Sequence, residues 1–479
     1  MSSNGLVIAY SVLSVIVHAV GIVNAGHAVM HVRTSQGAIA WGILLITFPW
    51  LAIPLYWVFG RNHFFGYQEA MRHTYLQHHR RIHEIYSQLK TYQVSLPEPL
   101  QALDALAQTL TPLAFTTGNQ VALLIDGEQT YEAMLQAIAT ATHYILLQSY
   151  IINADQAGND FQQALIDRAQ QGVRIYVLYD EIGSKRLPRS YIRSLRQQGI
   201  QVSAFHANKG KGNRFQLNFR NHRKILVVDG TTAFVGGLNI GDEYLGKDPK
   251  LSPWRDTHMQ VEGPGVQALQ SSFLGDWCWA TGELPEVSWE VFPTSDHNAT
   301  ALILPSGPAD TLPTCQLFFL NAMNLAQTRL WIASPYFVPD ESVLASLKLA
   351  ALRGVDVRIL LPNHPDHLFV YLCSFAYYHE LQSVGIKLYR YKQGFMHQKI
   401  ILIDDAIAGV GTVNLDNRSF FLNFEVMGFI VNAPFVQSVE TMLKNDLAAS
   451  VPVDLEDYRR KPFWFRLIVR AARLLAPVL

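Results

Sequence analysis

Two long apolar segments open the chain and set its N-terminal region apart. Residues 6–23 are almost wholly apolar, with His18 the one titratable residue, and residues 38–59 carry no charge at all. Each segment is long enough to cross a hydrocarbon core of ~30 Å. Because the opening MSSNG lacks the basic residues of a signal peptide and a second apolar segment follows at once, we expect two retained transmembrane helices. Pro49 and Pro54 should kink the second of them.

The positive charges around these segments predict their orientation. Only Arg33 lies between them, whereas Arg61, Arg72, Arg80 and Arg81 follow the second one. Because basic residues stay on the cytoplasmic side of a membrane, we expect a multi-pass protein whose large C-terminal part is cytoplasmic.

A polar connector follows over residues 61–115, with prolines at positions 97, 99 and 112. Its histidines could indicate a metal site: His63, His73, His78, His79 and His83. No acidic or cysteine partner completes such a site, so a solvated helical connector beside the membrane is the favoured interpretation.

From residue 119 onward, short apolar runs alternate with helical patterns, and the same order occurs twice. Residues 144–151, 161–171 and 173–179 read as strand, helix and strand, and residues 330–338, 347–353 and 355–361 repeat that order. We therefore expect an α/β fold with two duplicated lobes, each a mostly parallel β-sheet flanked by helices, related by a pseudo-twofold axis. The expected boundaries are 1–60 for the membrane hairpin, 61–115 for the connector, 116–290 for the first lobe and 291–479 for the second.

One pattern of polar residues also occurs twice, as HxK-x4-D-x6-G-x-x-N. It spans His222–Asn239 (HRKILVVDGTTAFVGGLN) and His397–Asn414 (HQKIILIDDAIAGVGTVN), and the histidines are 175 residues apart (397 − 222). A single copy could be an ordinary strand end, but two copies in one chain make chance an unsatisfactory explanation.

Strand geometry predicts how the motif is used. Residues i and i+2 point to the same face, so His222 projects with Lys224, and His397 with Lys399. Asp229 and Asp404 fall where each strand ends, so we expect them to brace a turn rather than touch substrate. The next strand delivers Asn239 or Asn414 after a glycine-containing bend.

Each copy is half of a phosphate site, and two facing copies make a complete one. One histidine can attack phosphorus while the other protonates the leaving oxygen. The lysines and asparagines can hold the non-bridging oxygens, so no metal or other cofactor is required. Which histidine is the nucleophile stays open, because the two motifs are nearly symmetric.

Composition narrows the choice of partners. Lys plus Arg and Asp plus Glu are both 38, so the whole-protein basic field expected for nucleic acid is absent. Cys278, Cys315 and Cys373 are scattered without a CxxC, which suits a reducing compartment and neither a disulfide framework nor a zinc site.

The duplicated motif resembles the double HKD motif of the phospholipase D superfamily, and further segments are similar to bacterial cardiolipin synthases with two membrane spans. These segments are NFRNHRK (218–224), WRDTH (254–258), SPYFVPD (334–340), GFMHQK (394–399) and NLDNRSFFLNFE (414–425). Gly237 stands where many relatives have serine. The resemblance covers nearly the whole chain and makes His222, Lys224, Asp229, His397, Lys399 and Asp404 the expected catalytic residues, with Asn239 and Asn414 as phosphate ligands.

The resemblance also implies acids that orient the catalytic histidines. Asp256 follows the first histidine by 34 residues and Glu425 follows the second by 28. We therefore expect Asp256 to orient His222 and Glu425 to orient His397. The alternative for each acid is an ordinary salt bridge, with Arg255 or Arg418 as the partner.

The implied reaction transfers a phosphatidyl group from one phosphatidylglycerol to another at the bacterial inner membrane, through a phosphatidyl-histidine. Glycerol is released. A phospholipase D-type hydrolase is the alternative, and a nuclease or a non-catalytic scaffold fits the sequence less well.

Two further segments are expected to contact anionic lipid: the basic run 206–224, with Lys209, Lys211, Arg214, Arg220 and Arg223, and an amphipathic helix from Arg459 to the C-terminus. For the basic run the alternative is ordinary solvated loop charge, and for the helix it is packing on its own domain. No pattern in the sequence predicts the acyl-chain preference, the use of phosphatidylethanolamine, the oligomeric state or the regulation.

Overall fold

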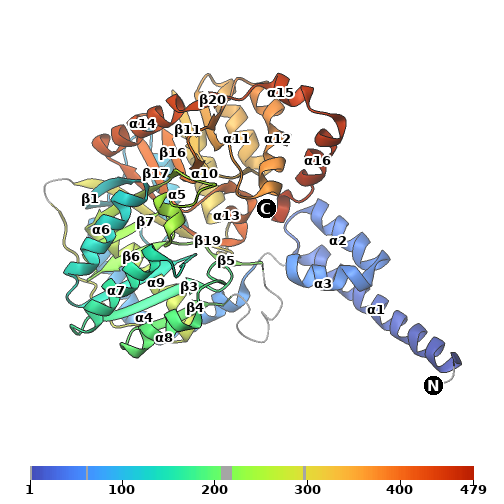
Figure 1. Ribbon diagram of the computed structural model, residues 1–479, viewed down its shortest axis with the longest axis horizontal. Coiled ribbons are helices and arrows are strands. Elements are labelled where there is room, and N and C mark those ends of the chain that lie inside the picture. The colour runs from blue at the N-terminus through green and yellow to red at the C-terminus, as the bar shows by residue number, and fades with distance from the viewer. Residues whose placement is uncertain (1–2, 61–62, 207–217, 295–297, 479) are drawn as a thin grey trace. The chain divides into compact units, whose positions relative to one another are not determined.

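The computed structural model describes residues 3–60, 63–206, 218–294 and 298–478 (Figure 1). The chain divides into two compact units. Met1–Glu69 and His206–Phe219 form the first, and Ala70–Phe205 with Arg220–Leu479 form the second.

The first unit contains three apolar helices, α1 (Ser3–His31), α2 (Ser35–Thr47) and α3 (Pro49–Phe59). Helix α1 approaches α2 closely, since a Cβ on Gly21 would lie 2.3 Å from the carbonyl oxygen of Leu45. The Trp57 indole donates a hydrogen bond to Asn24 Oδ1 at 3.0 Å, which pairs two polar groups of α3 and α1. Apolar side chains of α1 are otherwise widely exposed, as those of a lipid-facing helix would be.

The second apolar segment is not one helix. Helix α2 ends at Thr47 and helix α3 begins at Pro49, and Phe48 between them has φ −130° and ψ 55°. Proline lacks an N–H and fits the first position of a helix, so the expected kink at Pro49 is a complete break, whereas Pro54 lies inside α3. Of the described helices, only that over Asn4–His31 is both long and apolar enough to cross a membrane by itself.

The second unit begins with helices and continues into the alternating region. Its N-terminal elements are α4 (Phe65–Leu89, which starts in the first unit), η1 (Lys90–Tyr92) and α5 (Gln101–Leu110). The first run of strands and helices is β1 (Thr116–Ile125), α6 (Asp126–Thr140), β2 (Tyr144–Ser149), α7 (Gln156–Ala169), β3 (Arg174–Asp180), α8 (Arg189–Gln197), β4 (Gln201–Phe205), β5 (Arg220–Asn221), β6 (Ile225–Val228), β7 (Thr232–Gly236), η3 (Asp242–Leu245), β8 (Trp254–Arg255), β9 (Thr257–Glu262) and α9 (Pro264–Thr281).

The second run alternates strands and helices in a similar way, although it has an extra strand, β12, between β11 and α11, and further elements at the C-terminus. It comprises β10 (Ala299–Ser306), α10 (Thr314–Leu325), β11 (Arg329–Ala333), β12 (Phe337–Val338), α11 (Glu341–Leu352), β13 (Asp356–Pro362), α12 (Leu368–Gln382), β14 (Lys387–Tyr391), β15 (Phe395–Met396), β16 (Ile400–Ile403), β17 (Ile407–Gly411), β18 (Leu415–Asp416), α13 (Asn417–Phe421), β19 (Asn423–Val431), α14 (Ala433–Ala448), β20 (Ser450–Pro452), α15 (Leu455–Arg460), α16 (Phe463–Arg473) and η4 (Ala476–Val478).

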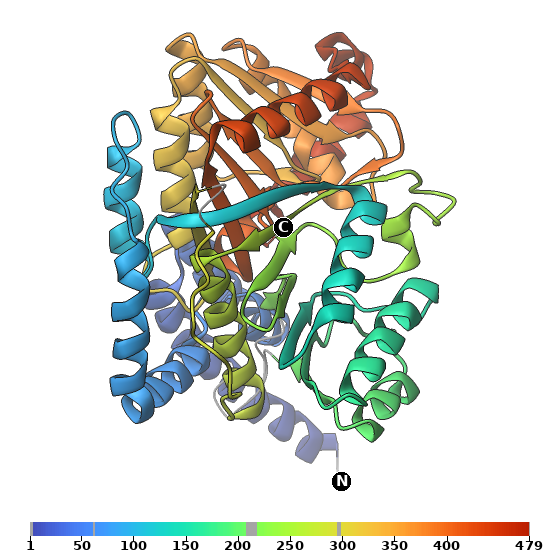
Figure 2. The same cartoon turned by 90° about the vertical axis from the view of Figure 1, so that its left-hand side faces the viewer.

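Most of these strands form one continuous sheet with helices on its two faces (Figures 1 and 2), while β8 pairs with β15 and β12 with β18 in two separate two-stranded sheets. The order of the continuous sheet is β20-β14-β13-β11-β16-β17-β19-β10-β1-β9-β7-β6-β2-β3-β4. Strands β1 and β10 pair at the centre, where Thr116 lies opposite Ala301. On either side of that pair, the strand that follows the motif histidine, β6 or β16, lies in the interior of the sheet.

The expectation of mostly parallel sheets is wrong. Parallel pairs occur along β2-β3-β4 and β11-β13-β14, whereas the other neighbours on the path are antiparallel. The parallel strands are those joined by helical crossovers, which is the connection that parallel pairing requires. Strands β6 and β7, like β16 and β17, are joined by tight turns, and such a connection permits only antiparallel pairing.

Asp229 and Asp404 brace turns, as expected from their position at the strand ends. The Asp229 carboxylate accepts hydrogen bonds from the backbone N–H groups of Thr142, His143 and Tyr144, at 2.7–2.8 Å. Asp404 does the same for the N–H groups of residues 327–329. Both aspartates have positive φ, 53° and 52°, and these hydrogen bonds pull the start of β2 or β11 onto the turn.

We predict that Asp229→Ala and Asp404→Ala act mainly through stability. Each change removes a cluster of backbone hydrogen bonds and puts a β-carbon without a compensating side chain at positive φ, so unfolding should become easier by about 2–4 kcal/mol. Thermal unfolding of the detergent-solubilised protein measures this. The matched control is Asp405→Ala, since Asp405 is exposed and pairs only at the surface with Arg329. A normal melting temperature together with lost turnover would contradict the bracing role.

Packing on its own unit, the alternative interpretation of the C-terminal segment, is confirmed for helix α16, and contact with lipid stays a prediction. It packs on α12, and Val469 and Ala472 are buried. Its other face exposes Phe463, Trp464 and Leu467, each by more than half. The helix is therefore docked on its own unit and also presents an apolar surface to the surroundings.

Candidate active site

The first motif histidine is positioned by a strand from the other half of the sheet. Strand β5 pairs in parallel with the start of β19, and the His222 N–H donates to the carbonyl of Phe424 at 2.9 Å. That register puts His222 beside Glu425, and its Nδ1 lies 2.9 Å from Oε2 of that acid. Both side chains are buried.

The second motif histidine is held in the same way. Strand β15 pairs in parallel with β8, and the His397 N–H donates to the carbonyl of Arg255 at 2.8 Å. His397 Nδ1 lies 2.7 Å from Oδ2 of Asp256. Asp256 is fully buried, and its carboxylate also accepts from the backbone N–H of Thr257.

The two acids therefore serve the opposite histidines from those expected. Glu425 contacts His222, and Asp256 contacts His397. The cause is the exchange of short strands between the halves, because β5 extends toward β19 and β15 extends toward β8. The alternative of a salt bridge between Asp256 and Arg255 is wrong, since the Arg255 guanidinium pairs with Asp126 and Asp446.

Burial and charge set the ionisation of the site. Burial lowers the pKa of His222 to about 4 although the Glu425 carboxylate raises it. Burial, with the Lys399 charge, likewise lowers the pKa of His397 to about 4. Burial works in the opposite direction on Glu425, but the contact with His222 holds the pKa of this acid below its ordinary value.

These shifts decide the tautomer of each imidazole. At neutral pH both histidines are uncharged and both acids are ionised, so Nδ1 must carry the proton that is donated to the carboxylate. The lone pair then lies on Nε2 of each ring. Two neutral imidazoles, each with a lone pair on Nε2, can act as nucleophile and as general base.

The motif lysines lie beside their histidines, as strand alternation predicted. Lys224 Nζ donates to the carbonyl of His222 at 2.7 Å, and Lys399 Nζ donates to that of His397. Burial lowers the pKa of Lys399 to about 8 and that of Lys224 well below its ordinary value. The Lys399 charge also lowers the pKa of His222, which places the two motifs within electrostatic reach of each other.

The motif asparagines differ in their surroundings. Asn239 accepts from the N–H of Ile151 at 3.1 Å and donates to the Tyr244 hydroxyl at 3.0 Å. Asn414 is buried, and among the described residues its Oδ1 has no hydrogen-bond partner. Asp229 and Asp404 lie at the far ends of β6 and β16 from the histidines and are not brought into the site.

Three further residues pack around the histidines and the orienting acid. The Tyr150 ring packs edge-on against His222 at 5.1 Å between centroids, and the Trp254 ring packs at 5.1 Å from His397. Gly237 admits the orienting acid, because a Cβ there would lie 2.0 Å from Asp256 Oδ1. The resemblance draws attention to Gly237 and to the WRDTH segment that contains Trp254, whereas no sequence signal assigned Tyr150 to the site.

The residue between the histidine and the lysine of each motif is held by a buried acid. Arg223, the residue between His222 and Lys224, donates to both oxygens of Asp276 at 2.9 Å. In the other motif Gln398 occupies that position and donates to Asp446 at 2.7 Å. Of the basic run before the first motif, Arg223 is thus structural, and Lys209, Lys211 and Arg214 lie outside the described residues.

Known proteins are similar to this chain over nearly its whole length. The sequence profile of the "Cardiolipin synthase, PLD-like domain" family matches the chain twice, over residues 134–273 and 319–447. The chain is 46% identical over 478 residues to "Cardiolipin synthase A" of Pseudomonas fluorescens Pf-5, covering 98% of each chain. It is 47% identical over 471 residues to "Cardiolipin synthase A" of Pseudomonas aeruginosa LESB58, covering 97% of this chain and 95% of that one.

A solved structure shares the fold. The phosphatidylserine synthase of Haemophilus influenzae Rd KW20 superposes with a TM-score of 0.60 at 15% identity, over 79% of this chain and all of that one. With the apolar N-terminal helix, these relatives indicate association with a membrane. The chain therefore belongs to the cardiolipin synthase family and is a phosphatidyltransferase of the phospholipase D superfamily.

Proposed function

We propose that the protein transfers a phosphatidyl group from one phosphatidylglycerol to a second one, giving cardiolipin and glycerol through a phosphatidyl-histidine intermediate. The observation that carries the proposal is the pair of buried, neutral histidines, each held at Nδ1 by an ionised acid from the opposite half. Such a pair provides one nucleophile and one proton carrier at a single phosphorus atom.

The reaction runs in two displacements. His222 Nε2 attacks the phosphodiester of the donor lipid, and the glycerol oxygen departs with a proton from His397. The anionic diester favours the protonated form of His397 needed for this step, because it adds negative charge beside an imidazole of low pKa. His397 then takes the proton of the acceptor hydroxyl as that oxygen attacks phosphorus and the bond to His222 breaks.

Four further side chains support the transferred group in this proposal. Lys224, Lys399, Asn239 and Asn414 hold the non-bridging oxygens, where negative charge builds in the transition state. Asp229 and Asp404 act indirectly, through the turns that they brace. One phosphodiester is broken and one is formed, so the exchange is close to thermoneutral and needs no nucleotide.

We assign this chemistry to two duplicated lobes, residues 116–290 and 291–479, related by a pseudo-twofold axis. The double match of one family profile and the equivalent strand orders on either side of the β1–β10 pair support the duplication. Residues 1–60 form the membrane part and residues 61–115 the connector in this proposal.

For the membrane part we propose a hairpin of α1 against α2 and α3, with the catalytic unit in the cytoplasm. The close approach at Gly21 and the Trp57–Asn24 hydrogen bond support the hairpin, and Arg33 as the one basic residue between the spans supports the orientation. A membrane-impermeant thiol reagent applied to intact cells should label a cysteine at Thr34 but not one at Gln163. Labelling of Gln163→Cys alone would reverse the orientation.

Purified enzyme supplied with phosphatidylglycerol alone tests the proposed reaction. We expect cardiolipin and free glycerol in equal amounts, because the acceptor is a second molecule of the same lipid. Thin-layer chromatography of radiolabelled lipid measures the products. Phosphatidic acid as the main product would instead establish the hydrolase alternative, in which water takes the place of the lipid hydroxyl.

A further inference from the structure

The two halves of the site present corresponding tyrosines. Tyr150 follows β2 and Tyr336 follows β11, both at the carboxyl edge of parallel strands, where ligands of α/β sheets bind. Gln148 lies opposite Ile225, and Ala333 lies opposite Ile400. The residues that follow β2 and β11 are therefore adjacent to the histidine–lysine segments that precede β6 and β16.

The direct surroundings of these two tyrosines differ. Burial and the Asp180 charge raise the pKa of Tyr150, while the charges of Arg220 and Arg418 lower it. Tyr336 instead donates a hydrogen bond to the carboxylate of Asp366. Two arginines thus lie near Tyr150 together with Asp180, whereas the Tyr336 hydroxyl pairs directly with a carboxylate.

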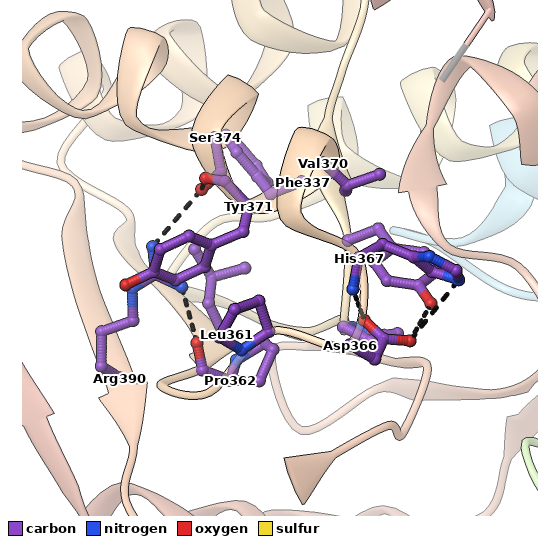
Figure 3. A pocket seen from close by; sticks show the side chains of 12 residues that line it. Phe337, Leu361, Pro362, Asp366, His367, Val370, Tyr371, Ser374 and Arg390 are labelled. Atoms are coloured by element: carbon purple, nitrogen blue, oxygen red, sulfur yellow. Dashed lines mark hydrogen bonds and ion pairs between the residues drawn. The ribbon is translucent and has the colours of Figure 1, made fainter. Parts of the chain in front are cut away.

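Asp366 belongs to a loop that leads from β13 into α12. Its side chain is one-fifth exposed, and the His367 ring lies 5.8 Å from that of Tyr336. Figure 3 shows Asp366 and His367 side by side at one wall of a pocket, with Arg390 at the opposite wall. Arg390 donates to the carbonyl of Pro362 at 2.6 Å and so holds the base of this loop.

Asp366 acts on the second half of the catalytic centre. Although burial lowers the pKa values of His397 and Lys399, the charge of Asp366 raises both. A carboxylate within reach of His397 accepts hydrogen bonds from hydroxyl groups.

We propose that Asp366, with Tyr336 and His367, forms the subsite for the hydroxyl groups of the glycerol headgroup that leaves from, or attacks, the phosphorus atom beside His397. This inference rests on the proposed function and adds the place of the alcohol. The half of the site near Tyr150, where Arg220 and Arg418 lie, then takes the phosphatidyl part of the donor lipid.

The chemical step follows from this placement. The primary hydroxyl of the bound glycerol unit forms the new P–O bond, the P–N bond to His222 breaks, and the hydroxyl proton passes to Nε2 of His397. The secondary hydroxyl of the same glycerol unit donates a hydrogen bond to Asp366 and so aims the attacking oxygen. His222 is the nucleophile in this arrangement because His397 is the histidine beside the alcohol.

Exchange of free glycerol into phosphatidylglycerol measures the subsite directly. The full-length enzyme in mixed micelles is given phosphatidylglycerol and radiolabelled glycerol. For Asp366→Asn we expect KM for glycerol to rise about tenfold while kcat stays within about threefold, since a charged acceptor of the bound hydroxyls is lost. With 1-propanol, which lacks the further hydroxyls, wild type and variant should behave alike.

The matched control is Asp405→Asn, which removes an exposed carboxylate and should change neither constant. Wild-type exchange with an unchanged KM in Asp366→Asn would overturn the subsite and leave the proposed function intact. Production of phosphatidic acid alone by the wild type would overturn both. A larger loss for ethanolamine than for glycerol would show that the subsite recognises an ammonium group, and would overturn the assignment to hydroxyls.

Discussion

Replacing His222 or His397 by alanine is expected to lower the rate of cardiolipin formation about 10⁴-fold or more. Each ring supplies an atom that forms or breaks a bond in the proposed reaction, and no other side chain of the described residues presents a lone pair held in the same way. Rates measured on phosphatidylglycerol in mixed micelles test this expectation.

Two further variants distinguish a loss of catalysis from a loss of folding. His222→Gln and His397→Gln keep an N–H that can donate to Glu425 or Asp256, so these buried acids stay paired while the nucleophile is lost. His143→Ala is the matched control, because this histidine is exposed and contributes only its backbone N–H to Asp229. Glutamine variants that melt normally and retain activity would refute the catalytic assignment.

Covalent trapping distinguishes the two histidines. Acid-quenched enzyme should carry radiolabelled phosphatidyl on His222, and His222→Gln should carry none. His397→Gln should form the adduct slowly, because its leaving group lacks a proton donor. An adduct on His397 would interchange the two roles.

Replacing Glu425 by glutamine is expected to reduce kcat by about 10²- to 10⁴-fold, and Asp256→Asn should do the same. An amide cannot hold the Nδ1 proton as a carboxylate does, so the correct tautomer is lost. The effect is large because each acid makes a bond of 2.9 or 2.7 Å to its histidine in a buried site.

The crossed arrangement makes this prediction specific to one ring. The Glu425 charge raises the pKa of His222, so Glu425→Gln should push that pKa further below about 4 and leave the pKa of His397 near its present value. Of the two motif histidines, Asp256→Asn should act only on His397, and each variant is thus the control for the other. Histidine ring resonances followed from pH 7 to pH 3 measure the shifts. A shift of His397 in Glu425→Gln would mean that each acid serves the histidine of its own half.

Local sequence patterns predicted the parts of the site that lie within a few residues of one another. Alternation along the strand put Lys224 beside His222 and Lys399 beside His397, and the position of Asp229 at a strand end predicted its turn. The buried runs 225–228 and 400–403 are interior strands, as their apolar character on both faces indicated. Each of these features depends on the backbone geometry of a single strand and its adjoining turn.

Patterns within one segment were less informative about how strands pair. The alternation of strands and helices predicts parallel pairing only for strands that are joined by a helix. Applied to the whole sheet this prediction is wrong, because most neighbouring strands are antiparallel. The uninterrupted apolar run over 38–59 likewise concealed the helix break at Phe48, because hydropathy does not register the missing N–H of Pro49.

The sequence by itself determined the family chemistry of this protein: two copies of one motif, their histidines and lysines, and the acids that accompany them. Only the tertiary structure decided which acid meets which histidine, and that Asp366 lies by Tyr336 on one side of the site while Arg220 lies by Tyr150 on the other. The reason is physical. A motif records the geometry of one segment, whereas these contacts depend on short strands such as β5 and β15 pairing with partners more than 100 residues away, a choice made by the packing of the whole sheet.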